Sequence, residues 1–185
     1  MALTKTPVCD FGKKAEDFKL KSIENKIISL NDVKGEKATI IMFICNHCPY
    51  VKAIIRDLAK DCNELKKDGI NSIAIMSNDT KNYPEDSFDN MIKFAKTNNF
   101  GEINYLIDET QEIARKYGAV CTPDFFGYNK KLKLEYRGRF RELKDLKPVS
   151  GGDSDLKIAM KMISETQAGP KEQIPSMGCN IKWFN

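Results

Sequence analysis

Histidine, tryptophan and long apolar runs are scarce in this chain of 185 residues, which contains one histidine and one tryptophan. The longest largely apolar stretch, ATIIMFIC at residues 38–45, has the length of a β-strand and is shorter than the ~18 residues of a membrane helix. The N-terminal residues MALTKTPVCDFGKK lack the apolar segment of a secretory signal. We therefore expect a cytoplasmic protein that makes no contact with a membrane.

Sequence patterns for nucleotides, haem and nucleic acids are also missing. The chain has no glycine-rich phosphate loop and no Cys-x-x-Cys-His run, so we expect no nucleotide, flavin or haem cofactor. The 30 Lys and Arg residues are mostly interleaved with the 26 Asp and Glu residues, for a net charge of +4. Nucleic-acid-binding surfaces gather basic residues on one face. We therefore expect no nucleic-acid partner, and we interpret the most basic stretch, residues 136–147, as an exposed connection between a strand and a helix.

Cysteine, in contrast, is abundant, with six residues. A chain of this length can bury a sizeable core and does not need a dense set of disulfides. In a reducing compartment, closely spaced cysteines are more often catalytic or metal-binding. The close pair is Cys45 and Cys48, and the single histidine, His47, lies between them. This Cys-Asn-His-Cys segment is therefore the first candidate site.

The hydrophobic pattern predicts strands that alternate with helices, followed by a final hairpin and helix. Expected strands are a hairpin over residues 18–30, then 38–44, 70–76, 103–108 and the antiparallel pair 124–129 and 131–138. Expected helices run from Pro49 to a stop before Gly69, and over residues 84–99, 109–118 and 153–166. This order implies an α/β fold in which a central mixed β-sheet is flanked by helices.

We expect a single domain over residues 1–185. Its last part, residues 167–185, is rich in proline and glycine, which predicts an irregular tail. Three large apolar residues near the end of the tail would dock it on the domain: Ile181, Trp183 and Phe184.

The two cysteines lie where the strand at residues 38–44 meets the helix that begins at Pro49. Free N–H groups at a helix N-terminus favour a thiolate, so the pKa of a cysteine there should fall below its usual value of ~8.5. We expect Cys45 to be the more exposed sulfur and the attacking thiolate, and Cys48 to be the buried resolving thiol. His47 would place an electropositive group or a hydrogen-bond donor beside Cys45. The alternative is that His47 is a surface residue without a redox role.

A second motif, Thr122-Pro123, opens the strand that follows the helix at residues 109–118. A hydrophobic strand, the segment Cys45-Asn46-His47-Cys48-Pro49, a helix, and then Thr-Pro before a hairpin and a last helix together resemble the thioredoxin superfamily. The N-terminal hairpin and the extra β–α unit at residues 70–99 are similar to its redoxin and peroxiredoxin-like branch. The segments NHCPYVKA and PSMGCNIKW resemble the subgroup described as alkyl-hydroperoxide-reductase/thiol-specific-antioxidant-like.

The resemblance implies a thioredoxin fold and a cis bond before Pro123. It also implies that Thr122 and Pro123 hold an extended substrate segment against Cys45 by main-chain hydrogen bonds, and we place Asn46 at the substrate as well. The expected activity is thiol–disulfide exchange through Cys45 and Cys48. The partners would be protein or small-molecule disulfides or dithiols, together with a thiol electron donor that the sequence does not identify.

Peroxide reduction is the main alternative activity. Peroxiredoxins share a Pro-x-x-x-Thr-x-x-Cys pattern, which would make Cys48 the peroxidatic cysteine. In this chain Ile41 replaces the proline, Cys45 replaces the threonine, and Thr122-Pro123 takes the place of an arginine. Little is then left to orient and polarise a peroxide bond. A binding module that keeps the fold without turnover is a further alternative.

A metal site belongs to a different class. Cys45, Cys48 and either His47 or Cys121 are candidate ligands for zinc or an iron–sulfur cluster. Structural zinc takes four such ligands, commonly as two close pairs, and this chain has one pair. We therefore expect no metal.

The remaining cysteines have separate interpretations. Cys62 lies on the apolar stripe of the first long helix and is expected to be a small buried hydrophobe. Cys121 is either a residue of the strand core or an accessory thiol. Cys179 is a candidate accessory thiol that reduces or caps the pair through a link to Cys45. Cys9 is expected to be an exposed thiol.

No acid lies on the strand before the pair, unlike in familiar thioredoxins. Deprotonation of Cys48 during resolution would then involve His47, water or an acid from elsewhere, such as Asp79. Asp79 belongs to a polar loop, residues 77–87, which follows a strand on the edge where open α/β sheets bind ligands.

Overall fold

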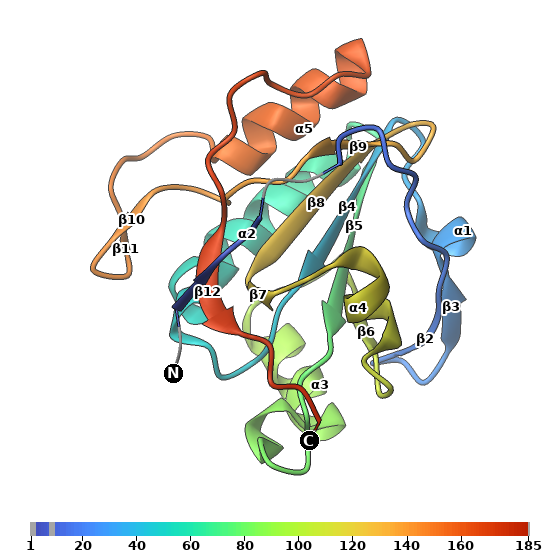
Figure 1. Ribbon diagram of the computed structural model, residues 1–185, viewed down its shortest axis with the longest axis vertical. Helices are drawn as coiled ribbons and strands as arrows, with labels where there is room; N and C mark the ends of the chain where they lie inside the picture. The colour runs from blue at the N-terminus through green and yellow to red at the C-terminus, as the bar shows by residue number, and fades with distance from the viewer. Residues whose placement is uncertain (1–2, 8–9, 185) are drawn as a thin grey trace.

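The computed structural model describes residues 3–7 and 10–184, and a seven-stranded mixed sheet forms its centre (Figure 1). The strand order is β3-β2-β6-β5-β4-β8-β9. β5 pairs in parallel with β4 and with β6, and the other neighbours are antiparallel. The bounds are Lys19–Ser22 (β2), Ile27–Ser29 (β3), Ala38–Phe43 (β4), Ile70–Met76 (β5), Asn104–Ile107 (β6), Asp124–Asn129 (β8) and Leu134–Tyr136 (β9). The predicted α/β fold with a central mixed sheet is confirmed.

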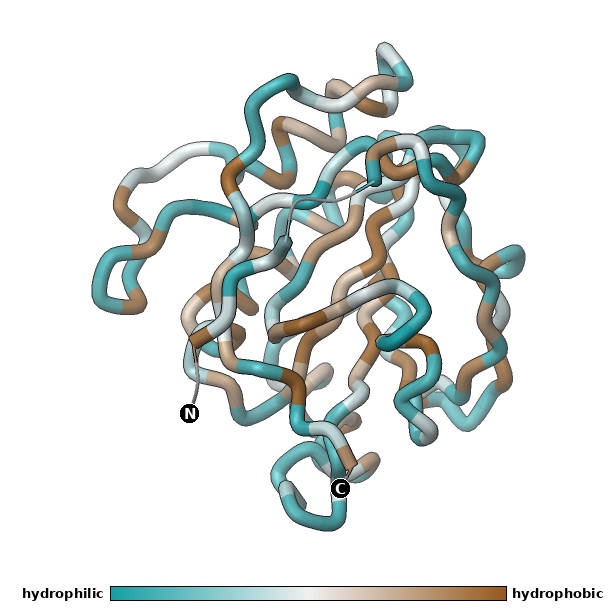
Figure 2. Tube along the Cα trace, in the orientation of Figure 1, coloured by the Kyte–Doolittle hydropathy of each residue, from teal (hydrophilic) through white to brown (hydrophobic). Residues whose placement is uncertain are grey.

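Helices cover both faces of this sheet. They are Leu30–Val33 (α1), Pro49–Lys66 (α2), Phe88–Thr97 (α3), Glu112–Tyr117 (α4) and Asp155–Thr166 (α5), with a 3-10 turn at Pro84–Asp86 (η1). Buried residues of α2, α3 and α5 pack with one face of β4, and those of α1 and α4 pack with the other. All of β4 is therefore buried, and apolar residues follow the central strands (Figure 2). Among the residues that the structure describes, no helix combines the length and apolar character needed to cross a bilayer.

Helix α2 begins where the sequence predicts it. Pro49 occupies the first helical position, where its missing N–H has no cost, and Cys48 is the N-cap residue. The predicted apolar stripe, which includes Ile54, Leu58 and Cys62, is buried in the core. This packing holds the Cys-Asn-His-Cys segment at the C-terminal end of β4.

The N-terminal hairpin and the extra β–α unit are confirmed as β2–β3 and as β5 with α3. The predicted hairpin extends one residue too far, because Ser29 and Asp32 form a capping box that begins α1 at Leu30. The helix predicted at residues 84–99 is instead η1 followed by α3, with an extended Ser87 between them. The break at Ser87 leaves η1 next to the Cys-Asn-His-Cys segment.

The prediction of an irregular C-terminal tail is wrong for Met177–Asn180, which form β12. This strand lies between β1 (Leu3–Lys5) and β7 (Cys121–Thr122) in a three-stranded antiparallel sheet (Figure 1). Gly178 allows the close approach, because a Cβ atom there would lie 2.1 Å from the carbonyl oxygen of Thr122. The end of the tail thus lies beside the Thr-Pro motif.

The docking residues of the tail differ in burial. Ile181 is buried and Trp183 is half-buried beneath the guanidinium of Arg115, which lies 4.2 Å from the ring centroid. Phe184 is exposed, so the prediction that it docks is wrong. Main-chain and side-chain hydrogen bonds hold this part of the tail in place of a third apolar anchor, as described below.

The basic segment at residues 136–147 is not simply an exposed connection. Arg137 and Phe140 are buried, and Leu143–Lys144 (β10) pair with Lys147–Pro148 (β11) in a small hairpin. The guanidinium of Arg137 donates to the buried carboxylate of Asp124 at 3.1 Å, so its charge is compensated inside the protein. Sequence charge alone does not reveal this pairing.

Candidate active site

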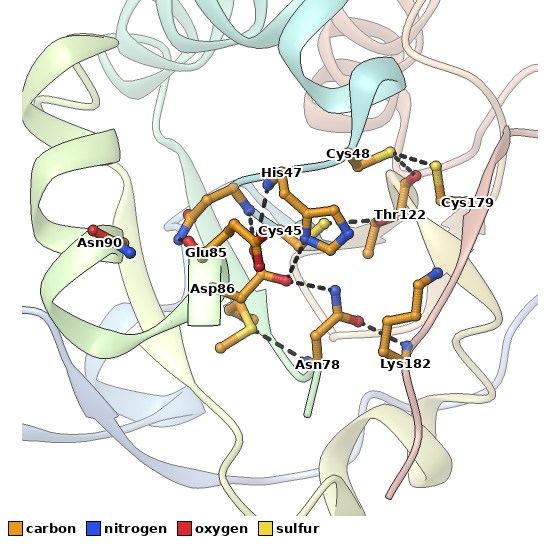
Figure 3. Close-up of polar contacts among 12 residues, drawn as sticks. Cys45, His47, Cys48, Asn78, Glu85, Asp86, Asn90, Thr122, Cys179 and Lys182 are labelled. Carbon is orange, nitrogen blue, oxygen red and sulfur yellow. Dashed lines mark hydrogen bonds and ion pairs between the residues drawn. The ribbon is translucent and has the colours of Figure 1, made fainter. Parts of the chain in front are cut away.

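The Cys-Asn-His-Cys segment lies at the C-terminal edge of the sheet, between β4 and α2 (Figure 3). The Thr122–Pro123 bond is cis, as predicted. Thr122 contacts both sulfur atoms of the pair: its Oγ1 lies 3.4 Å from the Sγ of Cys45, and its carbonyl oxygen lies 3.1 Å from the Sγ of Cys48. The structure therefore brings the two predicted motifs together in one site.

A third sulfur completes this cluster. The Sγ of Cys179 lies 3.0 Å from the Sγ of Cys48 (Figure 3). Cys179 is opposite Thr122 in the β12–β7 pairing, and this register sets its position. The sequence analysis predicted a link between Cys179 and Cys45. The structure instead places the Cys179 sulfur next to that of Cys48.

Burial of the two motif cysteines contradicts one prediction. Cys45 is 1% exposed and Cys48 is fully buried, so Cys48 is buried as predicted, whereas Cys45 is not appreciably more exposed. The described cysteines form no disulfide, and Cys179 is also buried. Reagents must therefore be small, or the surrounding segments must open, before either sulfur can react.

The acidity of the two cysteines is also reversed from the prediction. A hydrogen bond from the Cys45 thiol is the main cause that lowers the pKa of Cys48 to about 5. Hydrogen bonds from Cys179 and from the backbone N–H of Val51 lower it further, whereas burial raises it. The same hydrogen bond, together with burial and the charge of Asp86, raises the pKa of Cys45 well above its usual value. Cys48 is the N-cap of α2, where the helix field also favours a thiolate.

Asp86 is the acid that sequence analysis missed. Its side chain is fully buried, and Oδ1 accepts hydrogen bonds from the backbone N–H groups of Asn46 (2.8 Å) and His47 (3.3 Å). Its Oδ2 accepts from the side-chain amide of Asn78 at 2.8 Å and pairs with the Nδ1 of His47 at 2.7 Å (Figure 3). Asp79, the suggested acid, instead accepts hydrogen bonds within its own loop. Asp86 thus fixes the backbone of the motif.

His47 lies beside Cys45 as predicted, with a ring nitrogen within 4.8 Å of the Cys45 sulfur. Its ring pairs with Asp86 and stacks on the ring of Tyr83, with the centroids 5.6 Å apart and the planes 8° apart. The nearby carboxylate of Asp86 contributes a negative charge that raises the pKa of Cys45. The His47 side chain is 14% exposed, so the alternative of an ordinary surface residue is wrong. His47 belongs to the hydrogen-bonded support of the site.

Asn46 also faces the protein interior. Its side-chain amide donates to the carbonyl oxygen of Glu85 at 3.1 Å, and its Oδ1 accepts from the hydroxyl of Tyr105 at 2.9 Å. The residue is 7% exposed. These contacts tie the motif to η1 and β6, a supporting role that differs from the predicted contact with substrate.

Two other cysteines are buried outside this cluster. Burial raises the pKa of Cys62 to about 12 on the apolar face of α2, which confirms a small core residue. Burial also raises the pKa of Cys121, whose thiol donates to the carbonyl oxygen of Pro123 at 3.5 Å. Cys121 is therefore a strand core residue and not an accessible accessory thiol. Cys9 lies outside the described residues.

A metal-ligand grouping exists, but it differs from the predicted set. Within the described residues, ligand atoms of Cys45, His47 and Asp86 all lie within 4.8 Å of one another. The nitrogen and oxygen atoms of His47 and Asp86 already bond each other, so the buried carboxylate is satisfied without an ion. Three ligands also fall short of the four of a structural zinc site.

Sequence comparison decides the family. Residues 11–139 match the AhpC/TSA family. The chain belongs to this family. A crystal structure of an uncharacterised conserved protein from Geobacillus kaustophilus is 38% identical, with a TM-score of 0.94 over 100% of this chain and 97% of that one. A hypothetical protein from Sinorhizobium meliloti is 34% identical, with a TM-score of 0.90 over 98% of each chain.

More distant structures share the fold of this AhpC/TSA family member. The thioredoxin domain of a thiol-disulfide oxidoreductase from Bacteroides vulgatus is 17% identical, with a TM-score of 0.59 over 70% of this chain and 89% of that one. A comparison with curated protein sequences gives no significant match. The family and the fold confirm the redoxin branch of the thioredoxin superfamily, and together they support an oxidoreductase.

Proposed function

We propose that this AhpC/TSA family protein catalyses thiol–disulfide exchange, with Cys48 as the attacking thiolate and Cys45 as the resolving thiol. The observation that supports this assignment is the position of Cys48 at the N-cap of α2, with the thiols of Cys45 and Cys179 as neighbours. These groups lower the pKa of Cys48 to about 5, which favours the thiolate near neutral pH, whereas in the structure the Cys48 thiol donates hydrogen bonds to the Thr122 carbonyl oxygen and the Cys179 sulfur. The proposed roles of Cys45 and Cys48 are the reverse of those suggested by sequence alone.

The reaction begins when the Cys48 thiolate attacks one sulfur of a substrate disulfide. A mixed disulfide forms on Cys48 and one substrate thiolate leaves. Cys45 then no longer donates a hydrogen bond to a Cys48 thiolate, which removes the main reason for its raised pKa. Cys45 loses its proton, attacks Cys48 and releases the second substrate thiol, while the Thr122 hydroxyl stabilises the Cys45 sulfur as a thiolate. A thiol donor would return the Cys45–Cys48 disulfide to the reduced dithiol.

Small disulfides fit the site better than extended polypeptides do. The edge of β7 where an extended substrate was expected pairs with β12, so the chain's own tail occupies that position beside Thr122. A groove of about 430 Å³ shares Pro123 with the site and is also lined by Tyr50, Arg139 and Arg141. A small disulfide could place its remaining atoms there without displacing β12.

Peroxide reduction remains the second candidate because of one observation. Cys48, at the position of a peroxidatic cysteine, is the sulfur with the lowered pKa. Against this reading, the buried Arg137 donates to Asp124 and to the carbonyl oxygen of Gly118, and it stacks on Phe126. It is therefore engaged elsewhere and does not supply the cation that would polarise a peroxide bond.

Turnover of a small disulfide and of peroxide by the same protein tests the proposal. Consumption of glutathione disulfide and of hydrogen peroxide is measured with a dithiol donor, for the wild type and for Cys45→Ser and Cys48→Ser. We expect disulfide turnover that Cys48→Ser abolishes and that Cys45→Ser slows. Fast peroxide turnover that survives in Cys45→Ser and is lost in Cys48→Ser would replace exchange by the peroxidase function.

A further inference from the structure

We propose that Cys179 is a third redox thiol, which takes over the disulfide from Cys45 and forms a Cys48–Cys179 bond. This inference rests on the proposed exchange chemistry at Cys48. It assigns to the C-terminal strand β12 a part in the reaction in addition to its place in the fold.

The strand register places the two sulfur atoms for this bond. Cys179 lies opposite Thr122 in the antiparallel pairing of β12 with β7, and Thr122 contacts Cys48 through its carbonyl oxygen. The Sγ atoms of Cys48 and Cys179 are 3.0 Å apart, compared with about 2.05 Å in a disulfide. A movement of about 1 Å therefore suffices, and no refolding of the tail is required.

Hydrogen bonds on both sides of Cys179 keep it at this position. Before it, the hydroxyl of Ser176 donates to the carbonyl oxygen of Pro123 at 2.7 Å. After it, the backbone N–H of Lys182 donates to the side-chain oxygen of Asn78 at 2.9 Å (Figure 3). The tail is thus held at the site at both ends, so Cys179 has a high effective concentration against Cys48.

The proposed step is a thiol–disulfide exchange inside the protein. Cys179 gives up its proton, and its sulfur attacks the Cys48 sulfur of the Cys45–Cys48 disulfide. The Cys48–Cys179 bond forms, the Cys45–Cys48 bond breaks, and Cys45 leaves as a thiolate that takes up a proton. One disulfide and one thiol are present before and after the step, so no additional oxidant is needed.

The raised pKa of Cys179 limits the rate of this step. Burial, followed by the hydrogen bond and the charge of Cys48, raises the pKa of Cys179 to about 12 in the reduced site. The contribution of Cys48 disappears once its sulfur is part of a disulfide, and the charge of Lys182 continues to lower the pKa of Cys179. Burial remains, so loss of the Cys179 proton still limits the step.

A protein with Cys45→Ser isolates the attack of Cys179 on a disulfide at Cys48, with glutathione in the place of Cys45. It is treated with glutathione disulfide and followed by intact mass and peptide mapping. We expect a glutathione adduct on Cys48 that gives way to a Cys48–Cys179 disulfide without bound glutathione. In the Cys45→Ser/Cys179→Ser protein the adduct should persist on the order of 100-fold longer. Equal lifetimes in the two proteins would overturn the role of Cys179 while leaving attack by Cys48 intact, whereas no adduct in either protein would also overturn the proposed function.

Glycine substitutions test the geometry with every thiol retained. In the Cys45→Ser background, Gly178→Ala places a methyl group 2.1 Å from the carbonyl oxygen of Thr122 and should displace β12 from Cys48. The adduct on Cys48 should then persist. Gly151→Ala is the matched control, because a Cβ atom there meets nothing within 4 Å, and it should behave as the parent protein. Rapid formation of the Cys48–Cys179 disulfide in Gly178→Ala would contradict the inference.

Discussion

The Nδ1 atom of His47 lies 2.7 Å from the Oδ2 atom of Asp86, a carboxylate with no exposed surface. This pair connects the Cys-Asn-His-Cys segment to η1, which is nearly 40 residues later in the chain. The other oxygen of Asp86 accepts two backbone N–H groups of the same segment. One buried acid therefore sets both the backbone and the imidazole between the two cysteines.

Asp86→Asn should weaken this support. The amide keeps one acceptor oxygen, so at least one buried donor around position 86 loses its partner, at a cost of about 1–3 kcal/mol. The charge that contributes to the raised pKa of Cys45 is also removed, so that pKa should fall. Chemical denaturation and ultraviolet titration of the thiolates measure the two effects. The control is Asp89→Asn, which changes an exposed carboxylate at the start of α3 and should leave the stability and the thiolate titration nearly unchanged. An equal loss of stability in Asp86→Asn and Asp89→Asn would contradict the role assigned to Asp86.

Thr122→Val should slow resolution and leave the first attack intact. The hydroxyl lies 3.4 Å from the Cys45 sulfur and lowers the pKa of that residue, while the Thr122 carbonyl near Cys48 is unaffected by the substitution. Loss of one hydrogen bond of about 0.5–1.5 kcal/mol corresponds to an about 2- to 10-fold slower release of the second substrate thiol. Stopped-flow measurement of the two product thiols separates the steps. A slowed first phase with an unchanged second phase would count against this role.

The strands and helices that support the site could be predicted because their signals are local. The apolar run of β4 and the stripe on α2 each specify burial without reference to the rest of the chain. β12 could not be predicted in this way, because its partners are Leu3–Lys5 and Cys121–Thr122, far away in the sequence. A four-residue strand that contains a glycine carries too little pattern of its own.

The chemistry of the site was predicted less completely than its location. The two cysteines and the Thr-Pro motif follow from spacing and resemblance, but the more acidic sulfur depends on where protons lie among Cys45, Cys48 and Cys179. That distribution depends on contacts across the fold. Asp86 was missed because its loop also contains Asp79 and other polar residues, and only packing shows which carboxylate points toward the motif.

Reactivity of the reduced protein should depend on pH with a midpoint near 5. The pKa of Cys48 is lowered to about 5, so alkylation of this residue by iodoacetamide should reach half its maximal rate near that pH and stay level through neutral pH. Peptide mapping assigns the alkylated residue. A midpoint near the ordinary cysteine pKa of about 8.5 would contradict the lowered pKa.

The free energy of unfolding of the reduced protein should depend on the ionisation of Cys48. The pKa is lower in the folded state than the unfolded value of about 8.5, so the folded state favours the thiolate. The stabilisation is complete above about pH 8.5 and is lost as the pH falls toward about 5. Denaturation at a series of pH values under reducing conditions should show that the free energy of unfolding rises with pH. The rise should be smaller for Cys48→Ser.

The most direct test of the account is the identity of the first sulfur to react. Cys45→Ser/Cys179→Ser and Cys48→Ser/Cys179→Ser proteins each keep one motif cysteine, and serine retains a hydroxyl donor beside it. Both are mixed with glutathione disulfide at about pH 6, which lies between the pKa of Cys48 and the ordinary cysteine value, and adduct formation is timed by mass spectrometry. We predict a rapid adduct on Cys48 and a slow one on Cys45, because burial and the charge of Asp86 still raise the pKa of Cys45 without Cys48. A faster adduct on Cys45 would contradict the claim that Cys48 is the attacking thiolate.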